Sequence, residues 1–379
     1  MDYPHNRKTE IQDIFVYGAP SYLEKFPVNL QQRKALYSIV NCRGPLLGKH
    51  IDKCDRCGHL EISYNSCRNR HCPKCQAGKQ IVWVKKLGES LPPVRYFHLV
   101  FTLPHELNEL VYKYQKYCYP LLFKASAQTL QGVASRPGFL GAQTGCLSIL
   151  HTWGQNLHYH PHIHMLVPGG GISEDQMEWI PSGKKFFIPV KILSKVFRGK
   201  FISLLEDLIT RGTIPADLSG LKAQLYKKDW VVYSKNVFSG PGQVLHYLGK
   251  YTHRVAISNA RIISHNQGKV TFRWKDYRDG SRWKIMQLDT LEFIRRYLLH
   301  VLPVNFYKIR YYGIFSLSNR KQSLMRFFVL LRHQYTKSLK GIIENIKTTD
   351  ELSLRACPLC HVGTLRFYAI MPPCREKGP

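Results

Sequence analysis

The sequence predicts an α+β protein in which a small cysteine-rich head precedes a larger domain built around an antiparallel sheet. Of the eleven cysteines, six lie between Cys42 and Cys75 and three lie between Cys357 and Cys374. In the long middle, the expected elements follow the order strand, helix, strand, strand, helix, which favours an α+β domain. The expected domains are a zinc-binding head at 1–92, a larger domain at 93–303 and a basic C-terminal region at 304–379.

Two helices and a strand are expected around the head. Residues 31–41 form a helical segment that leads into the cysteines, and residues 79–91 form one that leaves them and ends at Pro92 and Pro93. The run 96–103 is rich in aromatic and β-branched residues, which predicts a buried strand.

Glycine and proline separate the elements expected in the rest of the chain. Gly240 to Gly242 break one helix from the preceding segment, Asp279 and Gly280 mark a hairpin turn, and Pro303 ends a helix. The expected helices are 105–132, 190–210, 243–257 and 291–302, and the expected strands are 146–151, 162–167, 270–274 and 281–287.

The chain is strongly basic. It has 55 Lys and Arg residues against 25 Asp and Glu, a formal charge of +30. An excess of this size repels itself unless an anionic partner balances it. Aromatic residues are interleaved with basic ones at 272–275 and 308–312, an arrangement in which rings stack on bases while cations follow phosphates. We therefore expect a nucleic-acid partner, since a solvated basic surface explains any one run but not the whole imbalance.

Neither a signal peptide nor a membrane span is expected. The first residues have no apolar core, and no apolar stretch reaches the ~18 residues that a span requires. We expect a cytoplasmic protein, without a membrane partner. In a reducing compartment, eleven cysteines indicate metal binding rather than disulfides.

Two C-x-x-C elbows lie close together in the head. Each elbow can supply two thiolates to one tetrahedral zinc ion. Basic residues that include Arg68 and Arg70 surround the elbows, so the zinc module is expected to grip DNA, with a purely structural role as the alternative. The expected zinc ligands are Cys54, Cys57, Cys72 and Cys75.

Other ligands could take part in this region. Cys67 and His71 could replace one elbow, or could help to form a second site with His50 or Cys42.

A further half-site lies near the C-terminus, where Cys357 and Cys360 form another C-x-x-C pair. Its possible partners are His361 and Cys374.

The densest group of metal-binding side chains lies at residues 151–164. Alternate residues of a strand share a face, so His162 and His164 point together on a rigid element. If the preceding strand pairs with this one, His151 arrives beside them as the third ligand. Neutral imidazoles with open positions suit a divalent ion that also holds a phosphate oxygen. The competitors for the third position are His158, His160 and Gln155.

Two tyrosines at i and i+4, Tyr247 and Tyr251, share a face if their segment is helical. Ordinary aromatic packing would explain such spacing, and Tyr307 and Tyr311 repeat it in a segment more typical of a strand or a DNA-facing loop. The first pair differs in its surroundings, which could steady a phosphate and lower the pKa of a phenol. The neighbouring side chains are His246, Lys250, His253 and Arg254.

Together these motifs resemble the transposases of insertion sequence family 91, a branch of the HUH superfamily. The segment 65–75, after the first elbow, is similar to the family's zinc-binding head. His162-Ile163-His164 resembles the HUH signature, and 247–259 resembles the paired-tyrosine motif. Residues 101–105 and 311–313 also fit. The likeness runs in the expected order from about residue 30 to about residue 315.

The resemblance implies rolling-circle transposition of single-stranded DNA at transposon ends. It implies an HUH-type antiparallel sheet with flanking helices and a Mg²⁺ or Mn²⁺ ion on the histidines, besides structural zinc. It also implies a tyrosine nucleophile that leaves a 5′-phosphotyrosine, with Lys250 and Arg254 near the DNA. The rival interpretations are a non-catalytic zinc-containing nucleic-acid binder and a metal-dependent hydrolase that uses water.

Overall fold

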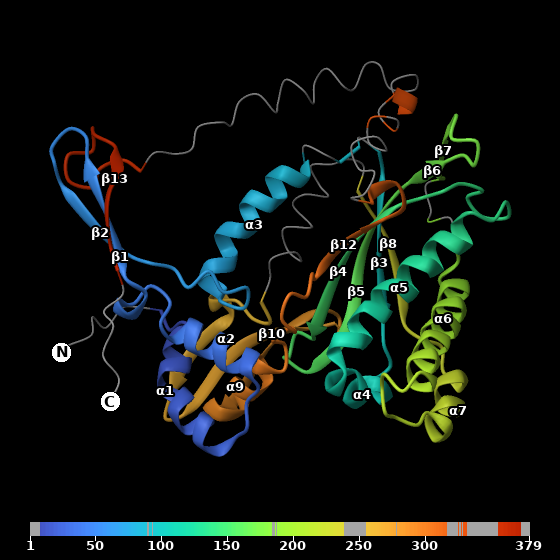
Figure 1. Cartoon of the computed structure of the whole chain (residues 1–379), viewed down its shortest axis with the longest axis horizontal. Helices are drawn as coiled ribbons and strands as arrows, with labels where there is room; N and C mark the ends of the chain where they lie inside the picture. Colours follow the sequence, from blue (N-terminus) through green and yellow to red (C-terminus); the bar gives the residue numbers. More distant parts are fainter. Residues whose placement is uncertain are drawn as a thin grey trace. The chain divides into compact units, whose positions relative to one another are not determined.

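The computed structural model describes residues 8–88, 91–92, 94–183, 186, 188–238, 255–277, 279–316, 325, 327, 329–331 and 355–372. The chain folds as two compact units (Figure 1). The first, the head unit, consists of Met1–Gln80, His253–Val301 and Gly341–Pro379. The second, the sheet unit, consists of Ile81–Thr252 and Leu302–Lys340. The chain returns to the head unit twice, so the units do not coincide with the three consecutive domains expected from the sequence.

In the head unit, helix α1 (Ile11–Lys25) packs against α2 (Leu30–Val40) and α9 (Thr290–Leu298). Gly18 permits a close approach, because a Cβ atom at this position would lie 2.6 Å from Cγ2 of Thr290. The rings of Phe15 and Tyr297 meet edge to face with centroids 5.0 Å apart, which joins α1 to α9 in one apolar interior.

An antiparallel sheet of order β11-β10-β9 precedes α9. The expected hairpin is present, with its turn at Asp279 and Gly280 and a left-handed φ of 54° at the glycine. The strands are β9 (Ile262–Asn266), β10 (Lys269–Asp276) and β11 (Arg282–Asp289).

A second antiparallel sheet of the head unit, called the ribbon, joins distant parts of the sequence. Strand β1 (Lys49–Cys54) lies between β2 (Leu60–Tyr64) and β13 (Leu365–Met371). The C-terminal strand therefore pairs with a strand that lies more than 300 residues earlier. No local signal in the sequence predicts this pairing.

The sheet unit is built on a five-stranded antiparallel sheet of order β12-β4-β5-β3-β8. The expected strands at 96–103, 146–151 and 162–167 correspond to β3, β4 and β5, the central three of this sheet. The strands are β3 (Tyr96–Thr102), β4 (Cys146–Trp153), β5 (Tyr159–Pro168), β8 (Val232–Phe238) and β12 (Ile309–Tyr312).

Two long helices cover one face of this sheet, α5 (Gln115–Ala134) and α6 (Val190–Thr210) (Figure 1). Phe101 of β3 meets Phe197 of α6 with ring centroids 5.1 Å apart, and Ile163 of β5 is fully buried in the same core. At ~25 cal/mol per Å² of apolar surface, burial of such side chains is the main term that fixes the sheet against its helices.

The remaining elements are short or lie at the edges of the units. The helix expected at 105–132 is broken at Tyr114, whose backbone leaves the helical region (φ −116°, ψ 40°). Among the described residues, no helix is both long enough and apolar enough to cross a membrane. The remaining helices and strands of the two units are α3 (Pro73–Gly88), α4 (Asn108–Lys113), α7 (Ser219–Lys227), β6 (Gly170–Ile172), β7 (Trp179–Pro181), η1 (Pro45–Leu47), η2 (His105–Leu107), η3 (Asn259–Arg261) and η4 (Gly313–Phe315).

The fold class expected from the sequence, α+β with antiparallel sheets and flanking helices, is confirmed. The helix expected at 190–210 has those bounds in the structure. The helix expected at 243–257 falls largely outside the described residues.

Gly313, directly after β12, allows a test of the close backbone contact between the end of this edge strand and the residues that precede β4. Its φ is 60°, and a Cβ atom would overlap the carbonyl oxygen of Thr144 and lie 3.0 Å from Cα of Gly145. We expect Gly313→Ala to lower the free energy of unfolding of the sheet unit by about 2 kcal/mol or more, measured by denaturant unfolding.

The matched control is Gly199→Ala in the middle of α6, where a Cβ atom would meet nothing within 4 Å. Alanine is the better helix former by ~1 kcal/mol, so this variant should unfold at higher denaturant than the wild type. Equal stability of the two variants would contradict the argument.

Candidate metal centres

The pairing of β4 with β5 brings three histidines together on one face of the five-stranded sheet. Alternation along β5 places His162 and His164 on this face, while Ile163 and Met165 enter the core beneath α5 and α6. His151 of β4 is the register partner of His162. The structure therefore brings His151 to the position expected for a third ligand.

The three imidazoles converge. Nε2 of His162 lies 3.1 Å from Nε2 of His164, and one ring nitrogen from each of the three histidines lies within 4.8 Å of the others. At a metal–nitrogen distance of ~2.1 Å, two ligands at a right angle are about 3.0 Å apart. The observed spacing of 3.1 Å fits a divalent ion bound by the Nε2 atoms of His162 and His164.

The tautomer of His162 is fixed by the backbone. Its Nδ1 lies 2.7 Å from the carbonyl oxygen of His160. Nδ1 therefore carries the proton and donates a hydrogen bond to that oxygen. The lone pair of Nε2 is then directed toward the convergence point.

His98 of β3 was not anticipated from the sequence. Its Nε2 lies 2.9 Å from Nδ1 of His164, and the two rings are stacked with centroids 5.1 Å apart. With a proton on Nδ1 of His164, that bond directs the lone pair of Nε2 of His164 toward the point where the imidazoles converge. His98 lies two residues from Val100, the register partner of His164, so only the sheet register reveals the contact.

The buried imidazoles are neutral. Burial lowers the pKa of His162 to about 3 and that of His98 to about 3, and burial also lowers the pKa of His164. Neutral imidazole is the form that binds metal ions, so no proton has to leave for an ion to bind.

The other candidates for the third ligand lie elsewhere. Gln155 and His158 lie in the connection between β4 and β5, which runs from Gly154 to His158. His160 contributes its carbonyl oxygen to His162, and its imidazole is not among the converging ring nitrogens.

The proposed nucleophiles Tyr247 and Tyr251 lie outside the described residues, together with Lys250 and Arg254. Of the competing pair, Tyr311 lies in β12, as the strand interpretation predicts, and Tyr307 precedes that strand with 78% of its surface exposed.

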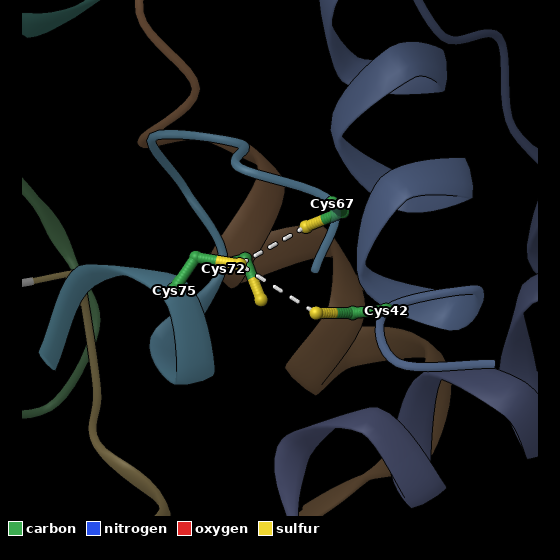
Figure 2. Close-up of side chains that lie close together, drawn as sticks. All are labelled: Cys42, Cys67, Cys72 and Cys75. Carbon is green, nitrogen blue, oxygen red and sulfur yellow. Dashed lines mark hydrogen bonds between the residues drawn. The ribbon is translucent and has the colours of Figure 1, made fainter. Parts of the chain in front are cut away.

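A four-cysteine cluster lies in the head unit, where Cys42 follows α2 and Cys75 lies in the first turn of α3 (Figure 2). Sγ of Cys75 is 3.6 Å from Sγ of Cys42 and 3.5 Å from Sγ of Cys67. With zinc–sulfur distances of ~2.3 Å, a tetrahedron separates its sulfurs by about 3.8 Å. The spacing therefore fits a closed zinc site. Its members are Cys42, Cys67, Cys72 and Cys75.

This cluster differs from the quartet that the sequence predicts, because Cys54 and Cys57 are not part of it. Cys54 ends β1, and β2 carries the chain back so that Tyr64 is the register partner of Lys49. Five steps of ~3.3 Å place the tip of this hairpin about 17 Å from its base. The first elbow lies at the tip and Cys67 follows the base, so the two elbows cannot share one ion.

The other predicted residues of the head occupy supporting positions. The imidazole of His71 is not in either cysteine cluster, whereas its backbone carbonyl accepts a hydrogen bond of 2.6 Å from the hydroxyl of Tyr297. Arg68 is exposed beside Cys67 with a left-handed φ of 52°. Arg70 is half-buried, and burial lowers its pKa.

The first elbow lies instead beside the C-terminal half-site. The sulfurs of Cys54 and Cys57 form a second cluster with those of Cys357 and Cys360. His361 is not a member, and Cys374 lies outside the described residues.

The contact of His98 with His164 generates a prediction. We expect His98→Ala to weaken Mn²⁺ binding about 10- to 100-fold, because His164 loses the partner that fixes its tautomer. His98→Gln, whose amide oxygen can accept the same hydrogen bond, should restore part of the affinity. Calorimetric titration of the metal checks both variants.

The control is His105→Ala, since the side chain of His105 is 80% exposed in η2. It should bind Mn²⁺ as the wild type does. Unchanged affinity in His98→Ala would exclude the positioning role.

Comparisons with known proteins identify the family of the chain. Residues 14–103 match a family model described as "Transposase zinc-binding domain", and residues 145–323 match one described as "Putative transposase". The chain is 43% identical over 373 residues to "Putative transposase y4qJ" of Sinorhizobium fredii, covering 94% of each chain. It is 28% identical over 303 residues to "Transposase for insertion sequence element IS801" of Pseudomonas savastanoi pv. phaseolicola, covering 74% of this chain and 68% of that one.

No solved structure matches the chain significantly. The family match spans both the cysteine-rich head and the histidine strands, and the similarity to the Sinorhizobium protein covers nearly the whole length. The chain therefore belongs to the transposases of insertion sequence family 91.

Proposed function

We propose that this transposase cuts and rejoins single-stranded DNA through a covalent tyrosine–DNA intermediate. The observation that carries the proposal is the convergence of three imidazoles on one sheet face, with the Nε2 atoms of His162 and His164 3.1 Å apart. A protein that only binds nucleic acid has no use for this site. The formal charge of +30 supports a polyanionic substrate, and we place the activity in the cytoplasm.

His151, His162 and His164 would hold a Mg²⁺ or Mn²⁺ ion. Such an ion, when bound, supplies positive charge to polarise the scissile phosphate. The protein contributes three neutral ligands on two paired strands, with the His160 carbonyl and His98 orienting the rings. The burial of His151 and His162 would keep these two ligands in place before DNA arrives.

Tyr247 or Tyr251 would act as the nucleophile. The phenolate oxygen attacks phosphorus, the bond from phosphorus to the 3′ oxygen breaks, and the 3′ oxygen takes a proton as it leaves as a hydroxyl. One phosphodiester replaces another, so the step needs no nucleotide cofactor. A second tyrosine would allow a further transfer before the first strand is released. Lys250 and Arg254, next to these tyrosines, would hold the phosphates.

The head unit would bind DNA. We propose that Cys42, Cys67, Cys72 and Cys75 bind a structural zinc ion that fixes the loop between β2 and α3. Arg68 projects from this loop, and its exposed guanidinium could meet a phosphate. Arg70 lies in the same loop and would contribute to the same surface. Because it is half-buried, only part of its side chain would be accessible to DNA.

The nucleophile is tested with single-stranded oligonucleotides of the transposon ends and Mn²⁺. The wild type should form a protein–DNA adduct that survives a denaturing gel, and Tyr247→Phe with Tyr251→Phe should form none. The matched control, Tyr307→Phe with Tyr311→Phe, repeats the spacing and should retain the adduct. Peptide mapping that finds DNA on Tyr307 or Tyr311, with the first pair unmodified, would overturn the assignment.

The metal site is tested by His162→Ala and His164→Ala. We expect the rate of cleavage to fall about 100-fold or more, because stabilisation worth several kcal/mol is removed from the reacting phosphate. Affinity for single-stranded DNA, measured by fluorescence anisotropy, should change little. Normal cleavage by either variant would show that the ion is not held here.

A further inference from the structure

A second four-cysteine cluster joins the two ends of the chain. Sγ of Cys54 lies 3.8 Å from Sγ of Cys360, and Sγ of Cys57 lies 3.7 Å from Sγ of Cys357. All four sulfurs lie within 4.8 Å of one another. Both distances match the ~3.8 Å edge of a zinc–thiolate tetrahedron and far exceed the ~2.05 Å of a disulfide.

The two elbows share one backbone design. The amide of Gly58 donates to the carbonyl of Cys54, and the amide of His361 donates to the carbonyl of Cys357, four residues apart in each case. Gly58 and His361, each directly after the second cysteine of its elbow, both have a left-handed φ (75° and 57°). Such tight turns aim both sulfurs of an elbow at one point.

Backbone amides also point at the sulfurs. Those of Arg56 and Cys57 lie 3.4 and 3.5 Å from Sγ of Cys54, and that of Gly363 lies 3.3 Å from Sγ of Cys360. Hydrogen bonds of this kind stabilise thiolate charge, which a metal ligand requires and a core thiol does not.

Gly363 lies in close contact with the same cluster. A Cβ atom there would overlap Sγ of Cys54 and lie 2.8 Å from Cβ of Arg56. The backbone of the C-terminal elbow therefore passes directly against the thiol of the N-terminal elbow, at a distance that only glycine allows.

The ribbon has too little apolar interior to hold its three strands together. Its buried cluster consists of Cys54, Cys357 and Leu365, with Cys360 packed against it, and Ile62 and Ile370 remain 55% and 68% exposed. Ion pairs at the surface, such as Arg366 with Asp55 at 3.3 Å, contribute ~1 kcal/mol or less. Sheets this small need a cross-link or a metal.

We infer that Cys54, Cys57, Cys357 and Cys360 bind a second structural zinc ion, which fastens β13 to β1 and closes the head unit with the C-terminal segment. Cys357 and Cys360 lie outside both stretches that match the family models. The inference concerns the fold of the head unit and does not depend on the tyrosine chemistry.

The test counts zinc in the full chain, purified under reducing conditions, by elemental analysis against protein concentration. All variants carry His162→Ala and His164→Ala, so that the histidine site adds no ion. The parent should hold two zinc ions per chain. Cys357→Ser with Cys360→Ser should hold one, and so should Cys67→Ser with Cys72→Ser. The control, Cys374→Ser, should hold two.

Two ions retained without Cys357 and Cys360, or a single ion in the parent, would overturn the proposal. A general failure to fold is distinguished because it would remove both ions together. Gly363→Val adds a check, since it keeps every thiol but displaces Cys54, and it should lose one ion.

Alkylation of the wild type gives an independent readout. Cys57 is exposed, so its sulfur is accessible to iodoacetamide unless a metal ion holds it. We expect Cys57 and Cys360 to stay unmodified until the metal is stripped by a chelator, and then to react together. Immediate labelling of Cys57 in untreated protein would refute the site.

Discussion

The antiparallel pairing of β4 with β5 is the constraint on which the candidate catalytic site depends. A shift of one residue would turn His162 and His164 toward α5 and α6 and bring Ile163 to the histidine face. That shift is prevented by the core on the other side, where Ile163, Met165 and Phe101 are fully buried. The core beneath the helices thus determines which side chains reach the histidine face, and the register of β3 adds His98 next to His164.

The head unit follows a different principle. Its ribbon buries little apolar surface, and cysteine clusters lie at both ends of the β1–β2 hairpin. With zinc at each cluster, the base of the hairpin is tied to α2 and α3 and its tip to the C-terminal elbow. Metal ions then replace the hydrophobic core that such small sheets lack.

Local signals in the sequence predicted the elements whose pattern is long or rich in aromatic residues, such as α6 and the histidine strands. Helix α1 was not predicted, because Gly18 and Pro20 are breaker signals that packing against α9 overrides. The cysteine quartet was misassigned for a related reason. Spacing along the chain cannot show that strand β2 carries Cys72 away from Cys57. It also cannot show that Cys42 joins the cluster of Cys72, or that Cys357 joins the cluster of Cys57. Likewise, His98 carries no motif and is revealed only by register.

The cysteine and histidine centres differ in their ligand atoms, and therefore in what a bound ion could do. Four thiolates around one zinc ion complete its coordination and leave a net negative charge, so such an ion can neither bind nor polarise a phosphate. Three neutral imidazoles leave the full charge of a divalent ion and open positions for oxygen ligands. In a chain with a formal charge of +30, phosphate is attracted broadly. Among the three metal-binding groups of the described residues, the histidine triad is the one that would offer a bound ion both charge and vacant coordination toward a phosphate. With the ions proposed above, the cysteine centres would hold the protein together and the histidine centre would act on DNA.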